Sequence, residues 1–569
     1  MKVSDYIVEA LVAHGITEAF CVVGGASMHL TNSLTRHPNI RTTFFHHETA
    51  CAQAAESFFR LTGRMAVVCV SSGPASWQAA VGVWGAWVDG QAMVVLAGQV
   101  KRETLNFGGV RQLGDQEADL GFMHQFTKQY KFLLQPKHVP QMLGCALVQA
   151  VADRPGPVWL EIPIDVQAAD LPAGCAWEPY VPRPPRLNQK LVDQAMDRMH
   201  GAERPVILLG SGLRTAGVDP DEPLRILDRL QVPVVTSFNA HDLIPHDCPL
   251  ACGRQGTIGD RPGNFTVQNA DFLLVLGSRM SVRQVGYDGT CGARAFKCQV
   301  DIDPNEMVKP TFMADLPIVA DLREFVEALG EAAWAPPAWH TDWLHWCRER
   351  VARYPVVQEG LPPNNPYRFV SDLWAELRDD DIVVCGNATA CIVPFQVAKI
   401  KKGQRLYSQS GAASMGWALP AAIGAARGAN GRRVICIDGD GSFQMNIQEL
   451  ATIAKNRLNV KIIVLNNGGY SSIRQTQQAY FPDNLHGLSE ETGVGFPAIG
   501  AIADAYGIPY EENLTDWDGP TLGQIDLDPK AGFAPRVKAK LLPDGRMVSP
   551  PLDDMYPFLP DAERQENLI

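Results

Sequence analysis

Two polar motifs follow two apolar runs in the last third of the chain. The runs VICI (434–437) and VKIIVL (460–465) each predict a buried parallel strand, followed by Asp440 between glycines and by Asn466 and Asn467. Glycine lets a backbone approach a phosphate, whereas a carboxylate beside a phosphate requires a divalent cation between them. Either motif alone is typical of a polar turn, but together they predict a cation and diphosphate site.

The elements that would position these motifs recur along the whole chain. Residues 442–465 are long enough for a helix and a returning parallel strand. Similar apolar runs alternate with helical patterns elsewhere, and proline-rich stretches at 177–187 and 361–369 separate three blocks. The alternation predicts an α/β fold of three consecutive doubly wound parallel-sheet domains. We place the domains at residues 1–180, 186–345 and 360–530, before a C-terminal tail over 531–569.

Composition and charge limit the possible partners and the cellular compartment. The net charge of −12 argues against nucleic acid as a main partner, and no apolar run has the length of a membrane helix. The N-terminus lacks the basic flank and cleavage site of a signal peptide. The thirteen scattered cysteines predict reduced thiols and a cytoplasmic protein, with Cys51 and Cys391 as small buried hydrophobes.

The motifs together resemble the thiamine diphosphate-dependent enzymes of the acetolactate synthase type. The resemblance rests on GDG followed by NN, on "YSQSGAASMGWALPAAIGAA" and on "CGNATA". It implies pyrimidine-binding, central FAD-binding-like and diphosphate-binding domains. It also implies that Asp440, the Asn467 side chain and the Gly469 carbonyl hold Mg²⁺, that Met415 wedges thiamine into its bent shape, and that the Ala413 carbonyl accepts from the aminopyrimidine. The other implied cofactor contacts are Asn387, Ala388, Thr389, Ala390, Gly439, Gly441 and Ser442, and the helix after the first motif is expected to begin at Ser442.

The same resemblance assigns catalytic residues in the first block. Glu48 in "HHETACAQAAESFF" matches the glutamate that binds the aminopyrimidine ring and promotes deprotonation of the thiazolium. On its own, Glu48 is an ordinary acid of a helical first turn. Gln116 in "LGDQEAD" matches a glutamine that faces the reacting carbon. His46 and His47 are proton donors or hydrogen-bonded structural residues. Because the family builds its site across a subunit interface, a homodimer or homotetramer is implied.

The middle block resembles the flavin-binding domain of this family. The motifs are "LLGSGLR", "GRQGTIG", "LGSRMSVRQVG" and "QVDIDPNE". The resemblance implies a structural rather than redox FAD, while a domain without flavin or with another nucleotide is the alternative. The implied contacts are Gly210, Ser211, Gly212, Gly256, Arg279, Arg283, Asp301 and Ile302, and Gly253 and Gly259 complete a three-glycine loop.

Departures from the family concern the acceptor. Thr476 stands where acetolactate synthases have a tryptophan, Asp115 replaces a phenylalanine, and Ala75 replaces a glycine. The first two make the acceptor side more polar. The segments "GGASMHL", "NNGGYSSIRQTQ" and "SPPLDDMYPFLP" are most similar to flavin-containing carboligases of the yersiniose-forming type, which extend nucleotide-linked keto sugars.

The expected reaction is therefore decarboxylation of pyruvate and transfer of the two-carbon unit to a ketone or 2-oxo acid, which includes a nucleotide-linked keto sugar. Authentic acetolactate synthase, a simple decarboxylase, a flavin-dependent oxidase and a silent subunit are the alternatives. The proline-rich tail is expected to wrap over a domain or to cover the active site, with a disordered tail as the alternative.

Overall fold

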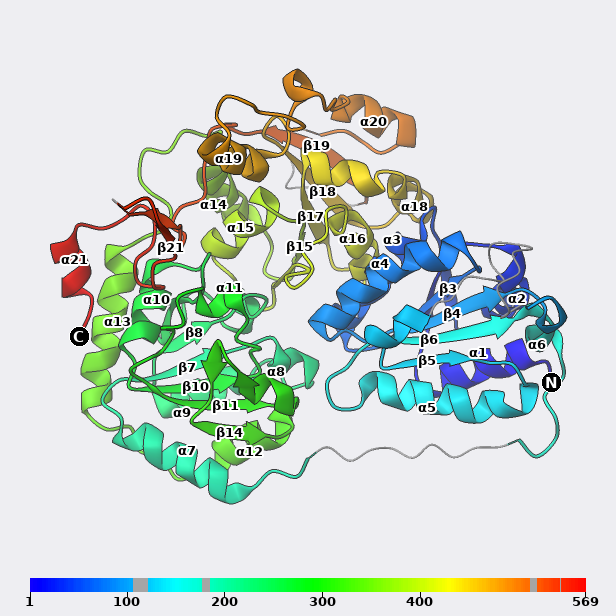
Figure 1. Cartoon of the computed structure of the whole chain (residues 1–569), viewed down its shortest axis with the longest axis horizontal. Helices are drawn as coiled ribbons and strands as arrows, with labels where there is room; N and C mark the ends of the chain where they lie inside the picture. Colours follow the sequence, from blue (N-terminus) through cyan, green and yellow to red (C-terminus); the bar gives the residue numbers. More distant parts are fainter. Residues whose placement is uncertain (106–120, 176–184, 512–518, 543) are drawn as a thin grey trace.

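The computed structural model describes residues 1–105, 121–175, 185–511, 519–542 and 544–569. Three parallel β-sheets, one in each block of the chain, carry helices on their faces (Figure 1). Alternate residues of a strand belong to different apolar clusters: in the first sheet Val68 and Val70 pack on one face, and Val67 and Cys69 on the other. The α/β fold with three parallel-sheet domains that the alternation predicts is confirmed.

The first sheet has six strands in the order β2-β1-β3-β4-β6-β5, all paired in parallel. Its strands are β1 Glu18–Cys21, β2 Arg41–Phe44, β3 Val67–Val70, β4 Val94–Gln99, β5 Gln129–Phe132 and β6 Val158–Pro163. Its helices are α1 Val3–Ala13, α2 Met28–Arg36, α3 Glu48–Thr62, α4 Pro74–Asp89, α5 Val139–Val151 and α6 Ile164–Ala168.

The central sheet also has six parallel strands, in the order β14-β11-β10-β7-β8-β9. They are β7 Pro205–Leu209, β8 Val234–Thr236, β9 Ala251–Arg254, β10 Phe272–Leu276, β11 Phe296–Asp301 and β14 Leu316–Val319. The helices are α7 Gln189–Gly201, α8 Gly212–Thr215, α9 Glu222–Leu230, α10 Arg261–Asn269, α11 Val282–Val285, α12 Leu322–Glu331 and α13 Trp339–Arg353.

The third sheet has five parallel strands in the order β16-β15-β17-β18-β19. They are β15 Ile382–Cys385, β16 Arg405–Tyr407, β17 Val434–Gly439, β18 Val460–Asn466 and β19 Thr521–Asp526. The helices are α14 Pro366–Glu376, α15 Thr389–Val397, α16 Ala418–Gly428, α17 Asp440–Phe443, α18 Glu449–Asn456, α19 Ser471–Tyr480 and α20 Ile499–Tyr506. None of the helices in the described ranges is both long and apolar enough to cross a membrane.

The first and third domains share one apolar core. Helix α3 packs along α16; α3 contributes alanines to the contact, and α16 contributes alanines and glycines. A Cβ on Gly424 would lie 2.0 Å from the carbonyl oxygen of Ala54, so only glycine permits this approach of the two helices. Figure 1 shows α3 and α4 beside α16. The close packing fixes the first domain against the loop that precedes α16.

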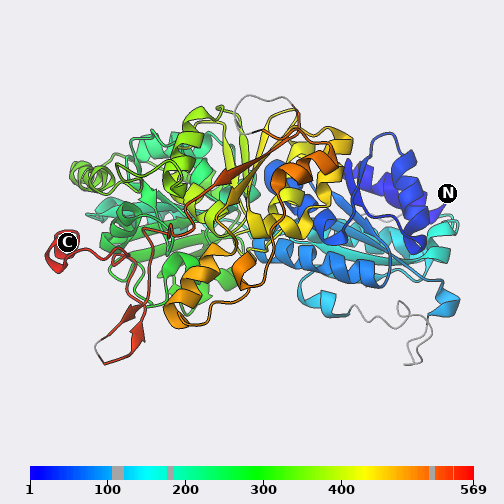
Figure 2. The ribbon, with the colours of Figure 1, turned by 90° about the horizontal axis from the view of Figure 1, so that it is seen from above.

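The C-terminal tail wraps over the central domain. Arg261 donates to the Met555 carbonyl at 3.2 Å, and Asn269 donates to the Asn567 carbonyl at 2.8 Å. The last helix, α21 (Asp561–Glu566), lies beside α13, with Glu563 accepting from Tyr354 at 2.8 Å. Figure 2 shows the tail, in red, running along the central domain. The described part of the tail therefore packs on the central domain, which agrees with the expectation that it wraps over a domain rather than with a disordered tail.

Candidate active site

Asp440 and Gly469 meet where β17 and β18 end. Helix α17 begins at Asp440 itself, two residues before the predicted start at Ser442. The two carboxylate oxygens of Asp440 accept from the backbone N–H groups of Gly441 at 2.8 Å and of Gly469 at 2.7 Å. Burial raises the pKa of Asp440 above its ordinary value, while these N–H groups oppose the rise. A cation at this carboxylate would favour its charged form.

Asn467 contributes a buried oxygen that has no partner. Its amide nitrogen donates to Thr389 Oγ1 at 3.3 Å, whereas its Oδ1 makes no hydrogen bond in the described part of the chain. Asn466, the preceding residue, instead donates to Asp526 on the neighbouring strand β19 at 2.7 Å. A buried unpaired amide oxygen costs free energy unless a ligand satisfies it. The carboxylate of Asp440 and this oxygen fit a hard divalent cation such as Mg²⁺.

The glycines of this site are required by packing as well as by any phosphate. A Cβ on Gly441 would lie 2.3 Å from the ring of Tyr470. Gly469 has φ of 111°, and a Cβ there would lie 1.9 Å from the carbonyl oxygen of Leu488. The sequence assigns Gly441 to phosphate approach and the Gly469 carbonyl to Mg²⁺, and the fold gives a second reason for glycine at both positions.

The segment around Met415 lies directly against the start of α17. Ser442 Oγ accepts from the Gly416 backbone N–H at 2.8 Å, and Asn446 donates to the Gly416 carbonyl at 2.7 Å. The side chain of Met415 is 39% exposed, which leaves it available to a ligand. Ala413 has φ of 53°, a conformation that is unfavourable for alanine and is held by surrounding contacts.

The loop after β15 joins the same group. Asn387 donates its side-chain N–H to the carbonyl of Ala413 at 3.3 Å, and Ala388 has φ of 48°. Thr389 then begins α15 and touches Asn467, as described above. Most of the residues predicted to bind the diphosphate half of the cofactor, from three separate loops, are therefore neighbours. Two strained alanines in one small region are typical of a functional site.

Glu48 lies at the corresponding edge of the first sheet. It is the first residue of α3, after β2, and its carboxylate makes no hydrogen bond or ion pair with another described residue. The neighbouring His47 hydrogen bonds through Nδ1 to Asn446 Oδ1 at 3.2 Å. The backbone N–H of His46 donates to Glu449 at 3.2 Å. Within one chain, the N-terminal end of α3 therefore touches the segment that follows α17.

A cavity of about 460 Å³ opens at the carboxyl ends of β1, β3 and β4, the edge to which Glu48 also belongs. Its walls include Gly25, Ala26, Ser71 and Pro74. Gln116, expected to face the reacting carbon, and Asp115, expected on the acceptor side, lie outside the described residues. Among the described residues, the cavity is thus lined mainly by uncharged side chains and lies at the carboxyl edge of the first sheet.

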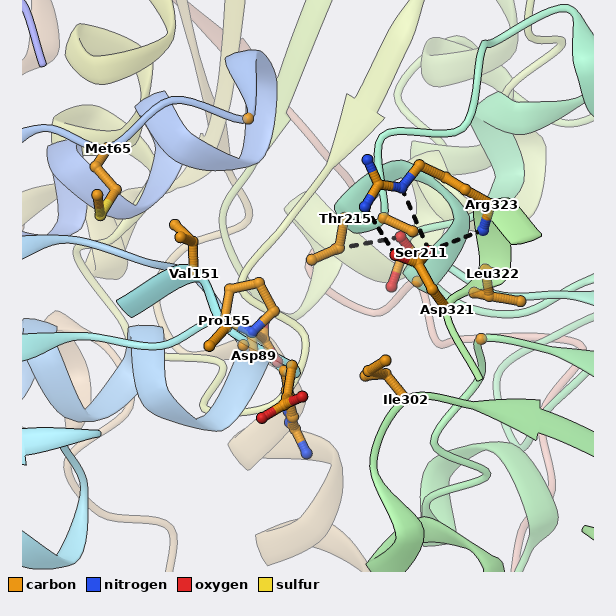
Figure 3. A pocket seen from close by; sticks show the side chains of 18 of the residues that line it. Met65, Asp89, Val151, Pro155, Ser211, Thr215, Ile302, Asp321, Leu322 and Arg323 are labelled. Carbon is orange, nitrogen blue, oxygen red and sulfur yellow. Dashed lines mark hydrogen bonds and ion pairs between the residues drawn. The ribbon is translucent and has the colours of Figure 1, made fainter. Parts of the chain in front are cut away.

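A larger cavity of about 690 Å³ lies between the first and central domains. Figure 3 shows Met65, Val151 and Pro155 on one side of it and Ser211, Thr215 and Arg323 on the other. Five of the residues predicted to bind FAD line it: Ser211, Gly212, Arg279, Asp301 and Ile302. Asp321 and Arg323, which follow β14 at the same sheet edge, were not singled out from the sequence, although "VADLREF" shows a strand end and a helix cap there.

The remaining predicted FAD residues lie outside this cavity's walls. A Cβ on Gly210 would lie 2.1 Å from the Gly277 carbonyl oxygen, so Gly210 is needed for the contact between two loops. Gly256 has φ of 137°, and its N–H donates to Asn264 at 2.9 Å. The guanidinium of Arg283 lies 5.9 Å from the ring centre of Phe238. Gly256 and Arg283 do follow strands β9 and β10, whose carboxyl ends belong to the same edge.

Asp301 has an unusual environment in the large cavity. It ends β11, is almost fully buried, and accepts from the Asp303 backbone N–H at 3.0 Å. Burial raises the pKa of Asp301 to about 6, and the nearby acids Glu306 and Asp303 add to the rise while Arg154 opposes it. A buried carboxylate with spare acceptor capacity fits a ligand hydroxyl.

Comparison with known proteins decides the family. Three family models match: "Thiamine pyrophosphate enzyme, N-terminal TPP binding domain" over residues 1–121, the "central domain" over 192–329 and the "C-terminal TPP binding domain" over 386–517. "Acetolactate synthase 2, chloroplastic" of Zea mays is 30% identical over 89% of this chain and 81% of its own length. "Acetolactate synthase isozyme 1 large subunit" of Escherichia coli (strain K12) is 28% identical over 94% and 95%. The chain belongs to the acetolactate synthase family of thiamine diphosphate-dependent enzymes.

As a member of this family, the protein is an acetolactate synthase-like enzyme of the carboligase and transferase class. Its most evident departure lies on α19. Thr476, which the resemblance places at the position of a family tryptophan, donates its hydroxyl to the carbonyl of Ser472 at 3.2 Å. A small hydroxyl side chain there leaves more space, and a more polar surface, than an indole ring would.

Proposed function

We propose that this enzyme decarboxylates a 2-oxo acid, pyruvate foremost, and transfers the two-carbon unit to a carbonyl acceptor, with a nucleotide-linked keto sugar as the preferred class. The observation that carries the proposal is the buried Oδ1 of Asn467, which has no hydrogen-bond partner among the described residues and lies two positions before Gly469, whose N–H donates to the carboxylate of Asp440. Such a pair fits a divalent cation. It occurs in a chain that matches both thiamine-binding family models.

Each residue has a role in this proposal. Asp440, Asn467 and the Gly469 carbonyl would hold Mg²⁺, and the loop N–H groups around Gly441 and Ser442 would bind the diphosphate. Thiamine diphosphate, when bound, supplies the electron sink that decarboxylation of a 2-oxo acid requires. Glu48 would hold a proton at the aminopyrimidine nitrogen, and its carboxylate, which has no hydrogen bond or ion pair with the described residues, is available for this role.

The acceptor class rests on α19. Polar residues dominate this helix, and Thr476 replaces a large apolar ring. An apolar slot discriminates poorly among small oxo acids, whereas polar side chains can select a hydroxylated acceptor by hydrogen bonding. Acetolactate synthase itself is the second candidate, because the curated relatives carry that name.

A structural FAD in the cavity between the first and central domains completes the cofactor set. Ser211 and Gly212 lie at the end of β7 and would approach the pyrophosphate, and Asp301 would accept from the ribose. The Gly256 and Arg283 loops, at the same sheet edge, would contact the far part of an extended flavin.

We also propose a homo-oligomer in the cytoplasm. Trp77, Val81 and Trp84 form an exposed apolar stripe along α4, with Trp84 at 44% exposure. A stripe of this kind, at helical spacing, is typical of a subunit interface. All thirteen cysteines lie in the described ranges and none forms a disulfide, which suits a reducing compartment.

Product analysis tests the proposal. The purified protein receives pyruvate, thiamine diphosphate and Mg²⁺, with or without a non-acidic ketone such as dihydroxyacetone, and the Glu48→Gln variant serves as control. A tertiary alcohol formed from the ketone, together with carbon dioxide, is the expected result. Acetolactate alone, with the ketone unchanged, would favour the acetolactate synthase alternative. Free acetaldehyde alone would indicate a decarboxylase, and acetate or peroxide an oxidase.

A further inference from the structure

A series of buried charges begins at the wall of the cavity between the first and central domains. Arg279 lines that cavity, and its side chain is 33% exposed. Its guanidinium donates to Asp89 Oδ1 at 3.0 Å and also to the carbonyl of Val88. Asp89, the last residue of α4, is only 3% exposed. Asp89 also lines the cavity, so the ion pair lies in the cavity wall and leads from it into the interior of the first domain.

Asp89 also holds the loop that carries the thiamine-contacting residues. The same Oδ1 accepts from the Gly411 backbone N–H at 3.0 Å, and Oδ2 accepts from Arg60 at 2.9 Å. A Cβ on Gly411 would lie 2.4 Å from Asp89 Oδ1, so the loop can approach this carboxylate only with glycine there.

The series continues to the other end of the loop. Arg60 pairs with Glu56 at 2.7 Å, and Glu56 Oε2 accepts from Gln409 Nε2 at 2.6 Å and from Trp417 Nε1 at 2.9 Å. Gln409 in turn accepts from Ser414 N–H through its side chain, at 3.2 Å.

Gln409 and Trp417 bracket Ala413 and Met415, the residues assigned to thiamine. The backbone of this segment is held as well, because the Gln409 carbonyl accepts from Ala413 N–H at 2.8 Å. Side chains from the first domain thus fix both ends of a loop that belongs to the third.

We propose that this series couples the two ligand sites: a nucleotide that contacts Arg279 in the cavity orders the 409–417 loop and so tightens thiamine diphosphate binding. The inference rests on the proposed cofactors. Within this series only Arg279 has substantial solvent exposure, so burial does not fully fix its side chain. A ligand that contacts the Arg279 guanidinium can therefore fix it further. Asp89, Arg60 and Glu56 are buried and paired. The energy of a buried charge changes strongly when one of its partners is lost or gained. Arg60 and Glu56 are positioning residues that line neither cavity, whereas Asp89 lines the large cavity beside Arg279 and joins it to them.

The test measures thiamine diphosphate affinity rather than turnover. The dissociation constant of the full-length protein for thiamine diphosphate, with Mg²⁺ present, is determined by calorimetry without FAD and with saturating FAD. We expect FAD to lower this constant by at least about fivefold in the unmodified protein, the lower end of typical coupling between sites. In Asp89→Asn and in Arg279→Gln, FAD should change it by less than about twofold. Thiamine diphosphate should tighten FAD binding by the same factor, because coupling is reciprocal.

Asp381→Asn is the matched control, because Asp381 is equally buried but pairs with Arg433 inside the third domain. It should retain the full coupling factor. Arg279→Gln alters a partly exposed side chain and keeps the test informative if Asp89→Asn does not fold. An unchanged factor in both variants, or a factor of one in the unmodified protein, would overturn the coupling. Flavin absorbance of the bound fraction and product analysis report separately on the proposed function, so a failure of either proposal is recognised independently.

Discussion

Replacing Asp301 by asparagine should stabilise the ligand-free enzyme at neutral pH. Burial raises the pKa of Asp301 from 3.8 to about 6, so the folded chain binds more protons than the unfolded chain between these two values. Stability is therefore lost as the pH rises through this window, and the loss is complete above it. The difference amounts to at most about 3 kcal/mol at pH 7, roughly half of that at pH 5 and less than about 1 kcal/mol at pH 4.

The substitution removes this penalty, and the asparagine Oδ1 can still accept from the Asp303 N–H. Thermal unfolding of ligand-free protein at pH 7, 5 and 4 measures the effect. If the central domain unfolds as one unit, about 3 kcal/mol corresponds to an increase of roughly 6–12 °C in its Tm at pH 7. The increase should shrink to a degree or two at pH 4. The same variant should bind FAD more weakly, because a neutral amide is a poorer acceptor for a ribose hydroxyl than a carboxylate is.

Asp242 provides a control of opposite sign in the same domain. Burial acts to raise the pKa of Asp242, but Arg214 and Arg405 outweigh this effect and lower the pKa below its ordinary value. Its carboxylate therefore stabilises the fold at neutral pH, and this contribution disappears as the pH falls through its folded pKa. Asp242→Asn should lower the Tm at pH 7 and have a smaller effect in acid. A lower Tm for Asp301→Asn at pH 7 would refute the reasoning, since it would mean that the ionised carboxylate is stabilised rather than penalised.

Three other substitutions test the site and the assembly. Asp440→Asn should abolish the stabilisation by Mg²⁺ and thiamine diphosphate, which is about 2.7 kcal/mol at a hundredfold excess over Kd, as measured by thermal shift; an unchanged shift would contradict the metal assignment. Glu48→Gln should lower product formation by roughly 10²–10⁴-fold while thiamine diphosphate affinity in calorimetry stays nearly constant, and a loss of binding instead would point to a structural role. Trp84→Glu should shift the mass measured by light scattering toward the monomer, and an unchanged mass would exclude the α4 stripe as an interface.

The fold was predictable because its strands are nearly continuous apolar runs. Buried parallel strands need such runs on both faces, and VKIIVL became β18 almost residue for residue. The start of α17 differed from the prediction because Asp440, whose side chain accepts from backbone N–H groups, already adopts a helical conformation. The path of the tail could not be predicted, since its contacts, such as Arg261 with Met555, join residues almost three hundred positions apart.

The grouping of the candidate diphosphate residues was predictable for a similar reason: neighbouring strands bring consecutive motifs together. Composition and spacing alone do not distinguish Asn466 from Asn467, and only the resemblance names Asn467; in the structure the Asn466 side chain bonds to β19 and the Asn467 side chain bonds to Thr389. The walls of the large cavity were only partly predictable, because half of them belong to the first domain, where Val151 and Pro155 carry no motif.

The contacts between domains follow from glycines whose purpose is invisible in the sequence. Gly85 lies within a helix, where glycine costs stability relative to alanine. A Cβ there would lie 2.2 Å from Gln409 Nε2, the atom that Glu56 holds. Gly411 and Gly424 permit the same closeness elsewhere along this interface. Because each glycine admits a side chain or backbone from another domain, the thiamine loop is positioned by the first domain of its own chain, and its geometry is a property of the whole subunit rather than of the third domain alone.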